Sequence, residues 1–235
     1  MLSKLFYYPV IVDNLSYLLF GRLAQGQPGG LLLTVLMALA AIAMAMVLGF
    51  ILALAHWFSP RGIQRVLWLL GEIVRGIPQL LLIFWFYFLL PMLLGRGAPD
   101  AVSVIVALGL FNAVTVMVSV LAGLNALPGG QHEAAQANGL NRWQTLRWVL
   151  LPQVLDHIVP SMVNLLVALI KDTSLAFVVS VPELTMVSTQ VNNREQIYPL
   201  EIFLFAGALY FVLCSLLSLG AGRLERRLNR RLGLR

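Results

Sequence analysis

Two apolar stretches of the chain each carry two charged residues, and these four side chains are the best placed to act on a polar solute. Glu72 and Arg75 are three residues apart, so on a helix they share a face and can form an ion pair. Lys171 and Asp172 are adjacent, so their side chains point in different directions. Charges within a membrane usually face a bundle interior or a water-filled path. They either pair with one another to hold helices together, or they line a path in which Arg75 and Lys171 bind a solute carboxylate.

Residues that can interrupt a helix follow each charged pair. Gly76 and Pro78 come directly after Arg75, and Thr173 and Ser174 come directly after Asp172. A broken helix at membrane depth exposes backbone polar groups to a polar solute. We therefore predict a solute path that contains Glu72, Arg75, Gly76, Pro78, Lys171, Asp172, Thr173 and Ser174.

No part of the sequence predicts catalysis or metal binding. It contains neither a nucleophile motif nor a glycine-rich phosphate loop, so we assign no catalytic residue. His56, His132 and His157 are far apart in the sequence and lack cysteine or acidic residues at metal-ligand spacing. We therefore expect no metal site and no cofactor bound by this chain.

The composition is that of a membrane protein. Hydrophobic residues make up 60% of the chain and charged residues 11%, whereas charged residues are about a quarter of a soluble protein. A helix needs about 20 apolar residues to cross a bilayer, and several stretches are that long. We predict an all-α integral membrane protein with five transmembrane helices, of which the second and fourth are interrupted: 30–56, 64–94, 101–127, 153–181 and 199–222.

The basic residues predict the orientation of these helices. Ten arginines lie on the side of the C-terminus, whereas four basic residues, Lys4, Arg22, Arg96 and Arg194, lie on the other. Because basic residues collect in cytoplasmic loops, the N-terminus is predicted outside and the C-terminus inside. The net charge of +6 is concentrated in a tail that follows a span and contacts lipid headgroups, so we expect no nucleic-acid binding.

The chain divides into three parts. Residues 1–29 are only partly apolar and are expected to form an interfacial helix on the outer face, ended by a Gln-Gly-Gln-Pro-Gly-Gly turn. Residues 30–222 form the transmembrane domain. Residues 223–235 form a basic cytoplasmic tail.

A polar, basic and helix-prone segment, residues 128–152, lies between the third and fourth spans. Asn138-Gly139 predicts a helix stop, because both residues tolerate a left-handed backbone. Asn141 can cap a second helix with Gln144 at its third position, and Pro152 suits the first turn of the next helix. Two such short helices are not stable alone. They must rest on this chain's own cytoplasmic ends, on another subunit or on lipid headgroups.

The same segment resembles a known motif. Glu133, Ala134 and Ala135 are followed after three residues by Gly139, and after nine more by Val149-Leu150-Leu151-Pro152. This spacing is similar to the E-A-A-x3-G-x9-I-x-L-P loop in permease subunits of bacterial ABC importers, with Val in place of Ile. The resemblance implies coupling helices that dock on an ATP-binding subunit, with Glu133, Ala134, Ala135, Gly139, Arg142, Leu151 and Pro152 at the contact.

Two further segments narrow the resemblance. "EIVRGIPQLLLIFWFYFLLP" and "LIKDTSLAFVVSVPEL" are similar to segments of the polar amino-acid permeases, especially the glutamate/aspartate type. Those permeases often have an acid and an arginine near the end of the third span. Here Val118 and Leu121 stand at those positions, so a site that depends on that pair is incomplete in this chain.

The resemblance implies a type I ABC importer permease of the bacterial inner membrane. It would act with two ATP-binding subunits that bind ATP and Mg, with a second permease that is identical or homologous, and with a periplasmic solute-binding protein. It would move a polar amino acid, such as glutamate or aspartate, by alternating access. The alternatives are a permease for another solute, such as an opine or osmoprotectant, and a channel or scaffold that does not couple to ATP.

Overall fold

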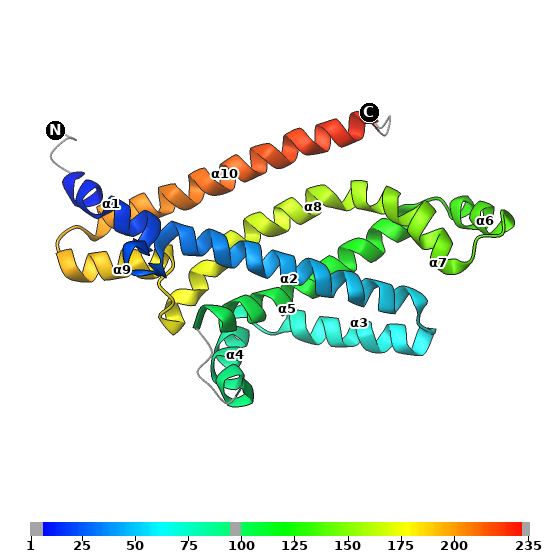
Figure 1. Cartoon of the computed structure of the whole chain (residues 1–235), viewed down its shortest axis with the longest axis horizontal. Helices are drawn as coiled ribbons and strands as arrows, with labels where there is room; N and C mark the ends of the chain where they lie inside the picture. The colour runs from blue at the N-terminus through cyan, green and yellow to red at the C-terminus, as the bar shows by residue number, and fades with distance from the viewer. Residues whose placement is uncertain (1–6, 95–99, 232–235) are drawn as a thin grey trace. The chain divides into compact units, whose positions relative to one another are not determined.

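The computed structural model of the protein describes residues 7–94 and 100–231, and almost all of its regular structure is helical (Figure 1). Lys4 and Arg96, which entered the prediction of orientation, lie outside the described residues. The elements are α1 Pro9–Phe20, β1 Gly21–Arg22, η2 Leu23–Gln25, β2 Gln27–Pro28, α2 Gly30–Phe58, α3 Arg61–Gly76, α4 Gln79–Leu94, α5 Asp100–Ala126, α6 Gly129–Ala137, α7 Arg142–Gln144, η3 Thr145–Leu150, α8 Leu151–Asp172, η4 Thr173–Val179, α9 Leu184–Glu195 and α10 Pro199–Arg231.

Within residues 7–94 and 100–231, four helical segments are long and apolar enough to cross a membrane: Gly30–Phe58, Asp100–Ala126, Ile158–Val179 and Pro199–Arg223. The pair α3 and α4 gives a fifth span if it is counted as one broken span. Both predicted interruptions are present, at Ile77-Pro78 and at the change from α8 to the 3₁₀ helix η4. The prediction of an all-helical membrane fold is confirmed, and the predicted five spans correspond to four or five among the described residues.

Helix α10 continues through the predicted basic tail as far as Arg231. Two elements differ from the prediction. The segment between the fourth and fifth spans forms α9, which we did not predict. The predicted turn before the first span is part of a small antiparallel hairpin, in which Gly21 pairs with Pro28 and Arg22 with Gln27.

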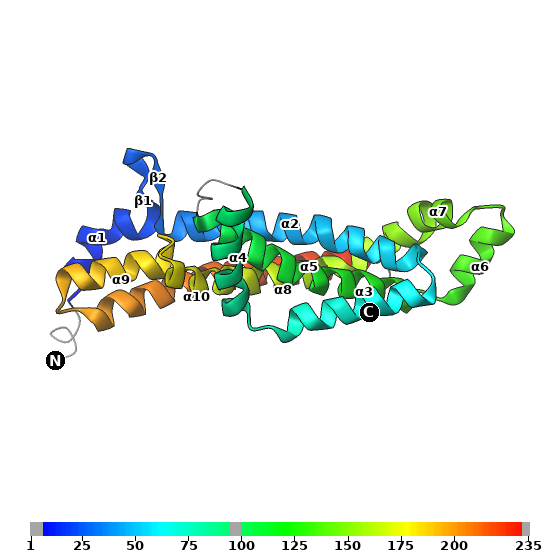
Figure 2. The same cartoon turned by 90° about the horizontal axis from the view of Figure 1, so that it is seen from below.

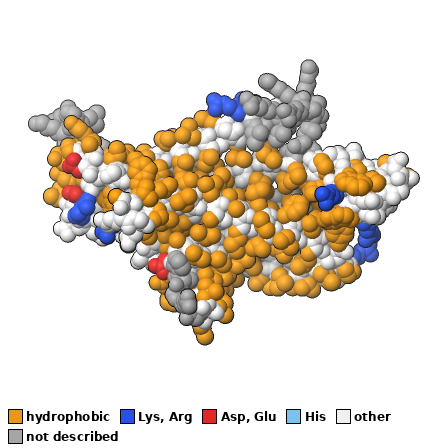
Figure 3. Space-filling model, viewed as in Figure 1, with side chains coloured by type: hydrophobic (Ala, Val, Ile, Leu, Met, Phe, Trp, Pro, Cys, Tyr) orange, Lys and Arg blue, Asp and Glu red, His pale blue; other side chains and the backbone are white. Residues whose placement is uncertain are grey.

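The chain forms two compact units, which are described separately. Unit 1 contains Met1–Ala43, Pro78–Gly109 and Leu166–Leu217, and unit 2 contains Met44–Ile77, Leu110–Leu165 and Ser218–Arg235. The surface seen in Figure 3 is mainly hydrophobic, and charged side chains gather over α1 and α9 of unit 1.

In unit 1, α1 packs against α9 and the start of α10 through a small hydrophobic core. Its buried members are Val10, Leu18, Val187, Val191 and Ile202. Tyr17 and Tyr198 are among the partly buried side chains that pack against it. The core therefore joins the two ends of the unit's sequence, and it fixes the polar residues of α1 beside those of α9.

The hairpin stands on the start of α2 (Figure 2), and glycines allow it to pack closely. Gly21 has φ +64°, and a Cβ there would lie 2.5 Å from Gly29 Cα. A Cβ on Gly29 would lie 2.9 Å from Pro182 O. Gly30 has φ +57° and donates its N–H to Pro182 O at 2.9 Å. Backbone therefore packs on backbone where the hairpin meets the segment before α9.

In unit 2, glycines allow helices to approach one another at three points. A Cβ on Gly49 of α2 would lie 2.5 Å from Val116 Cβ of α5. A Cβ on Gly71 of α3 would lie 2.8 Å from Val114 Cγ1, and one on Gly123 would lie 2.9 Å from Val154 Cγ1 of α8. Small residues at such contacts are the usual way for membrane helices to pack.

We expect Gly49→Ala to destabilise unit 2, because the added methyl group must displace Val116 and the backbone of α5. Such overpacking costs about 1–3 kcal/mol in a well-packed core. Gly62→Ala is a matched control, since a Cβ at Gly62 meets nothing within 4 Å. The measurement is thermal unfolding in detergent. Equal melting temperatures for the two variants would contradict the close contact.

Candidate functional site

The first predicted charged pair lies at the end of α3, in unit 2. Arg75 Nη1 donates to Glu72 Oε1 at 3.1 Å, and both side chains are nearly half exposed. The helix ends one residue later, at Gly76. Ile77 and Pro78 then separate α3 from α4. The charge of Glu72 is thus matched by Arg75 on the same helix face, and the pair does not join α3 to another helix.

The second predicted pair lies at the end of α8, in unit 1. Asp172 accepts a hydrogen bond from Gln79 Nε2 at 3.2 Å, so it links α8 to the first residue of α4. Lys171 is exposed, and no described carboxylate lies within ion-pair distance of it. Of the two cations predicted to bind a solute, Lys171 is the one without an ion pair among the described residues, although its charge interacts with that of the adjacent Asp172.

The hydroxyl residues after this pair differ in their surroundings. Thr173 is buried and its hydroxyl donates to Ile170 O at 2.7 Å, so it stabilises the change from α helix to 3₁₀ helix. Ser174 is partly exposed. Gln79 was missed from the sequence, although its place directly after Pro78 and before an apolar run is the signal that marks it.

The predicted coupling segment lies in unit 2, where α6 packs against η3 (Figure 1). Asn138 ends α6, and Gly139 takes φ +81°. Asn141 Oδ1 accepts from Gln144 N and Gln144 Oε1 accepts from Asn141 N, both at 2.9 Å. The predicted helix stop and capping box are confirmed.

The second helix of this segment is not a separate one, which corrects the prediction. Helical backbone runs without a break from Arg142 to Asp172, through π-helical turns at Thr145–Leu150. Pro152 therefore lies inside continuous helical backbone, just after the π-helical turns, and not in the first turn of a separate helix as predicted.

The predicted coupling residues divide into packing and exposed groups. Ala135 is buried against η3, and Leu140 N donates to Ala135 O at 3.1 Å. Glu133, Ala134 and Arg142 are exposed. An open groove of about 640 Å³ lies between α6 and η3, lined in part by Ala134, Ala135 and Val149. The segment thus presents a preformed, partly apolar surface with charged side chains on it.

The two positions at which the resembling permeases often carry charge are apolar here in structure as well as in sequence. Leu121 is buried and Val118 is partly buried in α5. Both lie within unit 2. Neither contributes a polar group to a solute path.

A buried carboxylate that we did not single out from the sequence organises unit 1. Glu183 is 0% exposed and precedes α9. Its carboxylate accepts from Thr185 N and Met186 N, both at 2.8 Å, and from Tyr210 Oη of α10 at 2.9 Å. Thr34 of α2 accepts from Leu184 N at 3.1 Å. The network joins α2, α9 and α10 around one acid, and the only sequence signal for it is an acid after Pro182 in an apolar stretch.

Comparison with known proteins decides the family. Residues 45–230 match the family described as the binding-protein-dependent transport system inner membrane component. The chain belongs to this family. It is the membrane-spanning permease subunit of an ABC importer of the inner membrane, and ATP hydrolysis belongs to separate ATP-binding subunits.

Individual relatives agree with this assignment over most of the permease. This chain is 34% identical over 200 residues to the probable glutamine ABC transporter permease protein GlnP of Bacillus subtilis. The matched region covers 84% of this chain and 91% of GlnP. The chain is 29% identical over 224 residues to the glutamate/aspartate import permease protein GltK of Escherichia coli O157:H7, covering 92% and 96%.

Solved structures share the fold. A crystal structure of an amino acid ABC transporter with histidines matches with a TM-score of 0.77 and 25% identity, over 96% of this permease and 97% of that chain. An inward-facing structure of the MetNI methionine ABC transporter matches with a TM-score of 0.71 and 21% identity, over 83% and 93%. The second match supports the fold alone.

Glu183 should make the stability of the permease depend on pH. Burial raises the pKa of Glu183 from 4.5 to about 7, although hydrogen bonds from Thr185, Met186 and Tyr210 oppose the increase. The folded protein therefore binds this proton more tightly than the unfolded chain. The stabilising contribution is complete below pH 4.5 and is lost as the pH rises through about 7.

We expect the melting temperature in detergent to fall between pH 5 and pH 8, and Glu183→Gln to remove much of this fall. The variant should also be less stable, because one amide oxygen replaces two carboxylate oxygens at the cap. Glu133→Gln, at an exposed position, is the control and should keep the wild-type slope. An unchanged slope in Glu183→Gln would contradict the assignment.

Proposed function

We propose that this permease imports a polar amino acid, of the kind that includes glutamate, aspartate and glutamine. The observation that carries the proposal is Lys171, an exposed cation with no described carboxylate at ion-pair distance, at the point where α8 changes to a 3₁₀ helix. An amino-acid carboxylate that leaves water needs charge-assisted hydrogen bonds. The names of GlnP and GltK support the same solute class.

We further propose an assembly of two permeases, identical or homologous, with two ATP-binding subunits and a periplasmic solute-binding protein. The N-terminus lies outside and the C-terminus inside, in agreement with the positive charge of the cytoplasmic ends. The solute path contains Glu72, Arg75, Gly76, Pro78, Lys171, Asp172, Thr173 and Ser174. ATP binding then changes the relative stability of two conformations of the permeases, which is the basis of alternating access.

The proposal is tested with the assembled transporter in proteoliposomes that contain ATP. Purified solute-binding protein delivers radiolabelled glutamate, aspartate, glutamine, an opine or an osmoprotectant. Uptake and ATP hydrolysis stimulated by an amino acid are the expected result. If only an opine or an osmoprotectant stimulates uptake and ATP hydrolysis, that solute and not a polar amino acid is the substrate. Uptake that continues without ATP would favour a channel.

The coupling segment provides a first prediction. We expect Gly139→Asp and Glu133→Lys to leave the subunit inserted but to separate ATP hydrolysis from uptake. Gly139 has a left-handed backbone that disfavours a side chain, and Glu133 is exposed for a basic partner on the ATP-binding subunit.

Gly139→Asn and Glu133→Asp are the matched controls, because asparagine has the size and backbone tolerance of aspartate without its charge, and aspartate at position 133 keeps the charge of glutamate. Both should retain most of the uptake. If Gly139→Asp and Glu133→Lys keep the wild-type ratio of uptake to ATP hydrolysis, docking through these residues is ruled out.

The cations of the path provide a second prediction. We expect Lys171→Ala to reduce uptake about tenfold or more, because one charge-assisted hydrogen bond contributes roughly 1.5–3 kcal/mol. Lys171→Arg should retain part of the uptake. Arg75→Ala should also lower uptake, but it leaves Glu72 unpaired on α3.

The amount of assembled transporter is measured in parallel by co-purification of the ATP-binding subunits. Uptake should fall far more than assembly in Lys171→Ala. A loss of assembly in proportion to the loss of uptake would instead assign Lys171 a structural role.

A further inference from the structure

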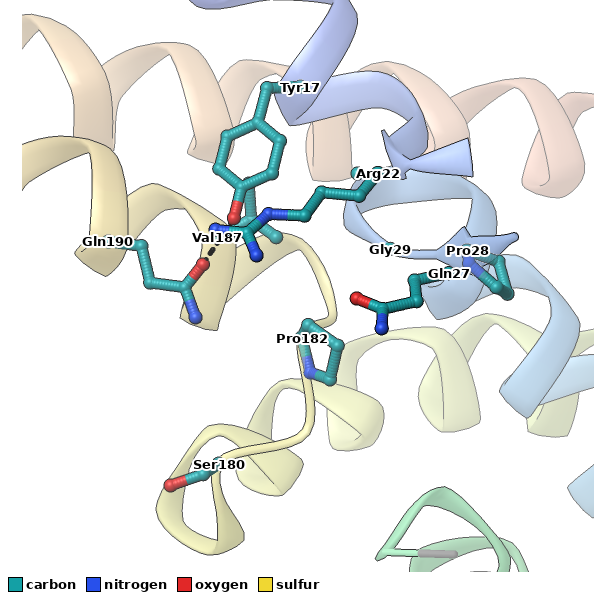
Figure 4. Close-up of a pocket in the computed structure, with 10 residues that line it drawn as sticks. Tyr17, Arg22, Gln27, Pro28, Gly29, Ser180, Pro182, Val187 and Gln190 are labelled. Atoms are coloured by element: carbon teal, nitrogen blue, oxygen red, sulfur yellow. Dashed lines mark hydrogen bonds between the residues drawn. The ribbon is translucent and has the colours of Figure 1, made fainter. Parts of the chain in front are cut away.

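A second polar site lies in unit 1, between the hairpin and α9, and is separate from the residues of the proposed path (Figure 4). It is a cavity of about 260 Å³ between the end of α1, the hairpin and the segment before α9. Its lining includes Tyr17, Arg22, Gln27, Ser180, Pro182 and Gln190. Cavities of this size suit small ligands rather than drug-sized ones, whose sites take about 300–1,000 Å³.

The walls of this hairpin cavity are held by close backbone contacts. Gly29 donates its N–H to Phe20 O at 3.1 Å, and Gly30 donates to Pro182 O. Ser180, on the opposite wall, has φ 61°, which is uncommon for a residue with a side chain. Backbone in such sparsely populated conformations collects at ligand sites, where the surrounding structure keeps it in place. The hydrogen bonds of Glu183 to Thr185 N and Met186 N fix the chain directly after Pro182, which is part of the same wall.

The charge of the hairpin cavity favours an anion. Among the described residues that line it, Arg22 alone is charged, and its guanidinium has no described hydrogen-bond or ion-pair partner. Arg194, by contrast, donates to Asn14 and pairs with Glu195 at 3.5 Å. Arg22 is therefore the available cation, and a guanidinium binds a carboxylate through two parallel hydrogen bonds.

Other polar groups of the hairpin cavity are arranged beside Arg22. Tyr17 Oη donates to Gln190 Oε1 at 2.5 Å, which directs the Gln190 amide nitrogen away from this bond. Figure 4 shows the ends of the Arg22, Tyr17 and Gln190 side chains together. A neighbouring hollow of about 530 Å³ shares Tyr17, Gly21, Arg22 and Gln190 with the cavity and adds Asp13 together with Arg194, which is paired with Glu195. The cation Arg22 and the exposed carboxylate of Asp13 thus lie in adjoining hollows, which is the complement of an amino-acid zwitterion.

We infer that the hairpin cavity binds the carboxylate of a free amino acid through Arg22, with Asp13 facing the ammonium group. This site would be the first contact of the solute with the permease, before the path that contains Lys171. The inference rests on the proposed function, since it takes an amino acid as the solute. The same carboxylate chemistry is also offered by acidic side chains of a solute-binding protein, so the experiment must separate the two sources.

The test uses the complete transporter in lipid nanodiscs, without solute-binding protein and without ATP. The probes are radiolabelled L-glutamine and an amino acid that carries a photoreactive diazirine. Photolabelling of the wild type should occur within residues 17–29 or 180–190 and should be suppressed by L-glutamine. L-Glutamine α-amide, which lacks the carboxylate, should not suppress it.

Arg22→Ala should reduce this labelling about tenfold or more, since a bidentate charge-assisted pair is lost. Arg22→Lys keeps the charge without the fork and should give an intermediate result. Arg61→Ala removes an exposed arginine of unit 2 and is the control. Labelling that is unchanged in Arg22→Ala, or competition by the α-amide equal to that by L-glutamine, would overturn the inference.

Two further outcomes separate the possible errors. If Arg22→Ala weakens binding of the solute-binding protein but leaves the labelling unchanged, the carboxylate belongs to that protein and the inference is wrong. If wild-type transporter takes up amino acids but shows no labelling at the hairpin cavity, this inference fails while the proposed function stands. If no amino acid drives uptake at all, the proposed function itself fails.

Discussion

Each place at which this chain stops being α-helical must satisfy the backbone groups that the break releases. In lipid such groups have no water to bond to, and each unsatisfied group costs several kcal/mol. Side chains close to the breaks supply the bonds. Glu183 accepts two N–H groups at the start of α9, and Gln64 donates to the carbonyls of His56 and Ser59 at the end of α2. These breaks in the helices are possible because polar side chains complete the hydrogen bonds of the backbone.

The charged residues of the described structure fall into two kinds. Arg75 and Arg194 have carboxylate partners on their own helices. Lys171 and Arg22 have no carboxylate at ion-pair distance among the described residues. The same is true of the exposed Arg61 of α3, so the lack of an ion-pair partner does not by itself assign a role.

Local patterns predicted much of the fold. The charge-free runs gave the spans to within a few residues, and Asn138-Gly139 and Asn141 gave the boundaries of the coupling helices, because caps and stops act over one turn. Helix α9 could not be predicted in the same way. Its sequence is polar and contains β-branched residues. Its start depends on Glu183, which accepts from Tyr210, and on Leu184, which donates to Thr34, and both partners are far away in the chain. The hairpin cavity has the same origin, since tertiary contacts bring its two walls together.

The contact between the hairpin and the segment before α9 also has a consequence for biosynthesis. Thr34 and Leu184 are 150 residues apart, and Gly30 and Pro182 are a similar distance along the chain. At about 5–20 residues per second, a ribosome needs roughly 8–30 s to make that stretch. During this interval the N-terminal helix and hairpin exist without their partner wall. The hairpin therefore gains its contacts late. They form only after Pro182 and Leu184 have been synthesised.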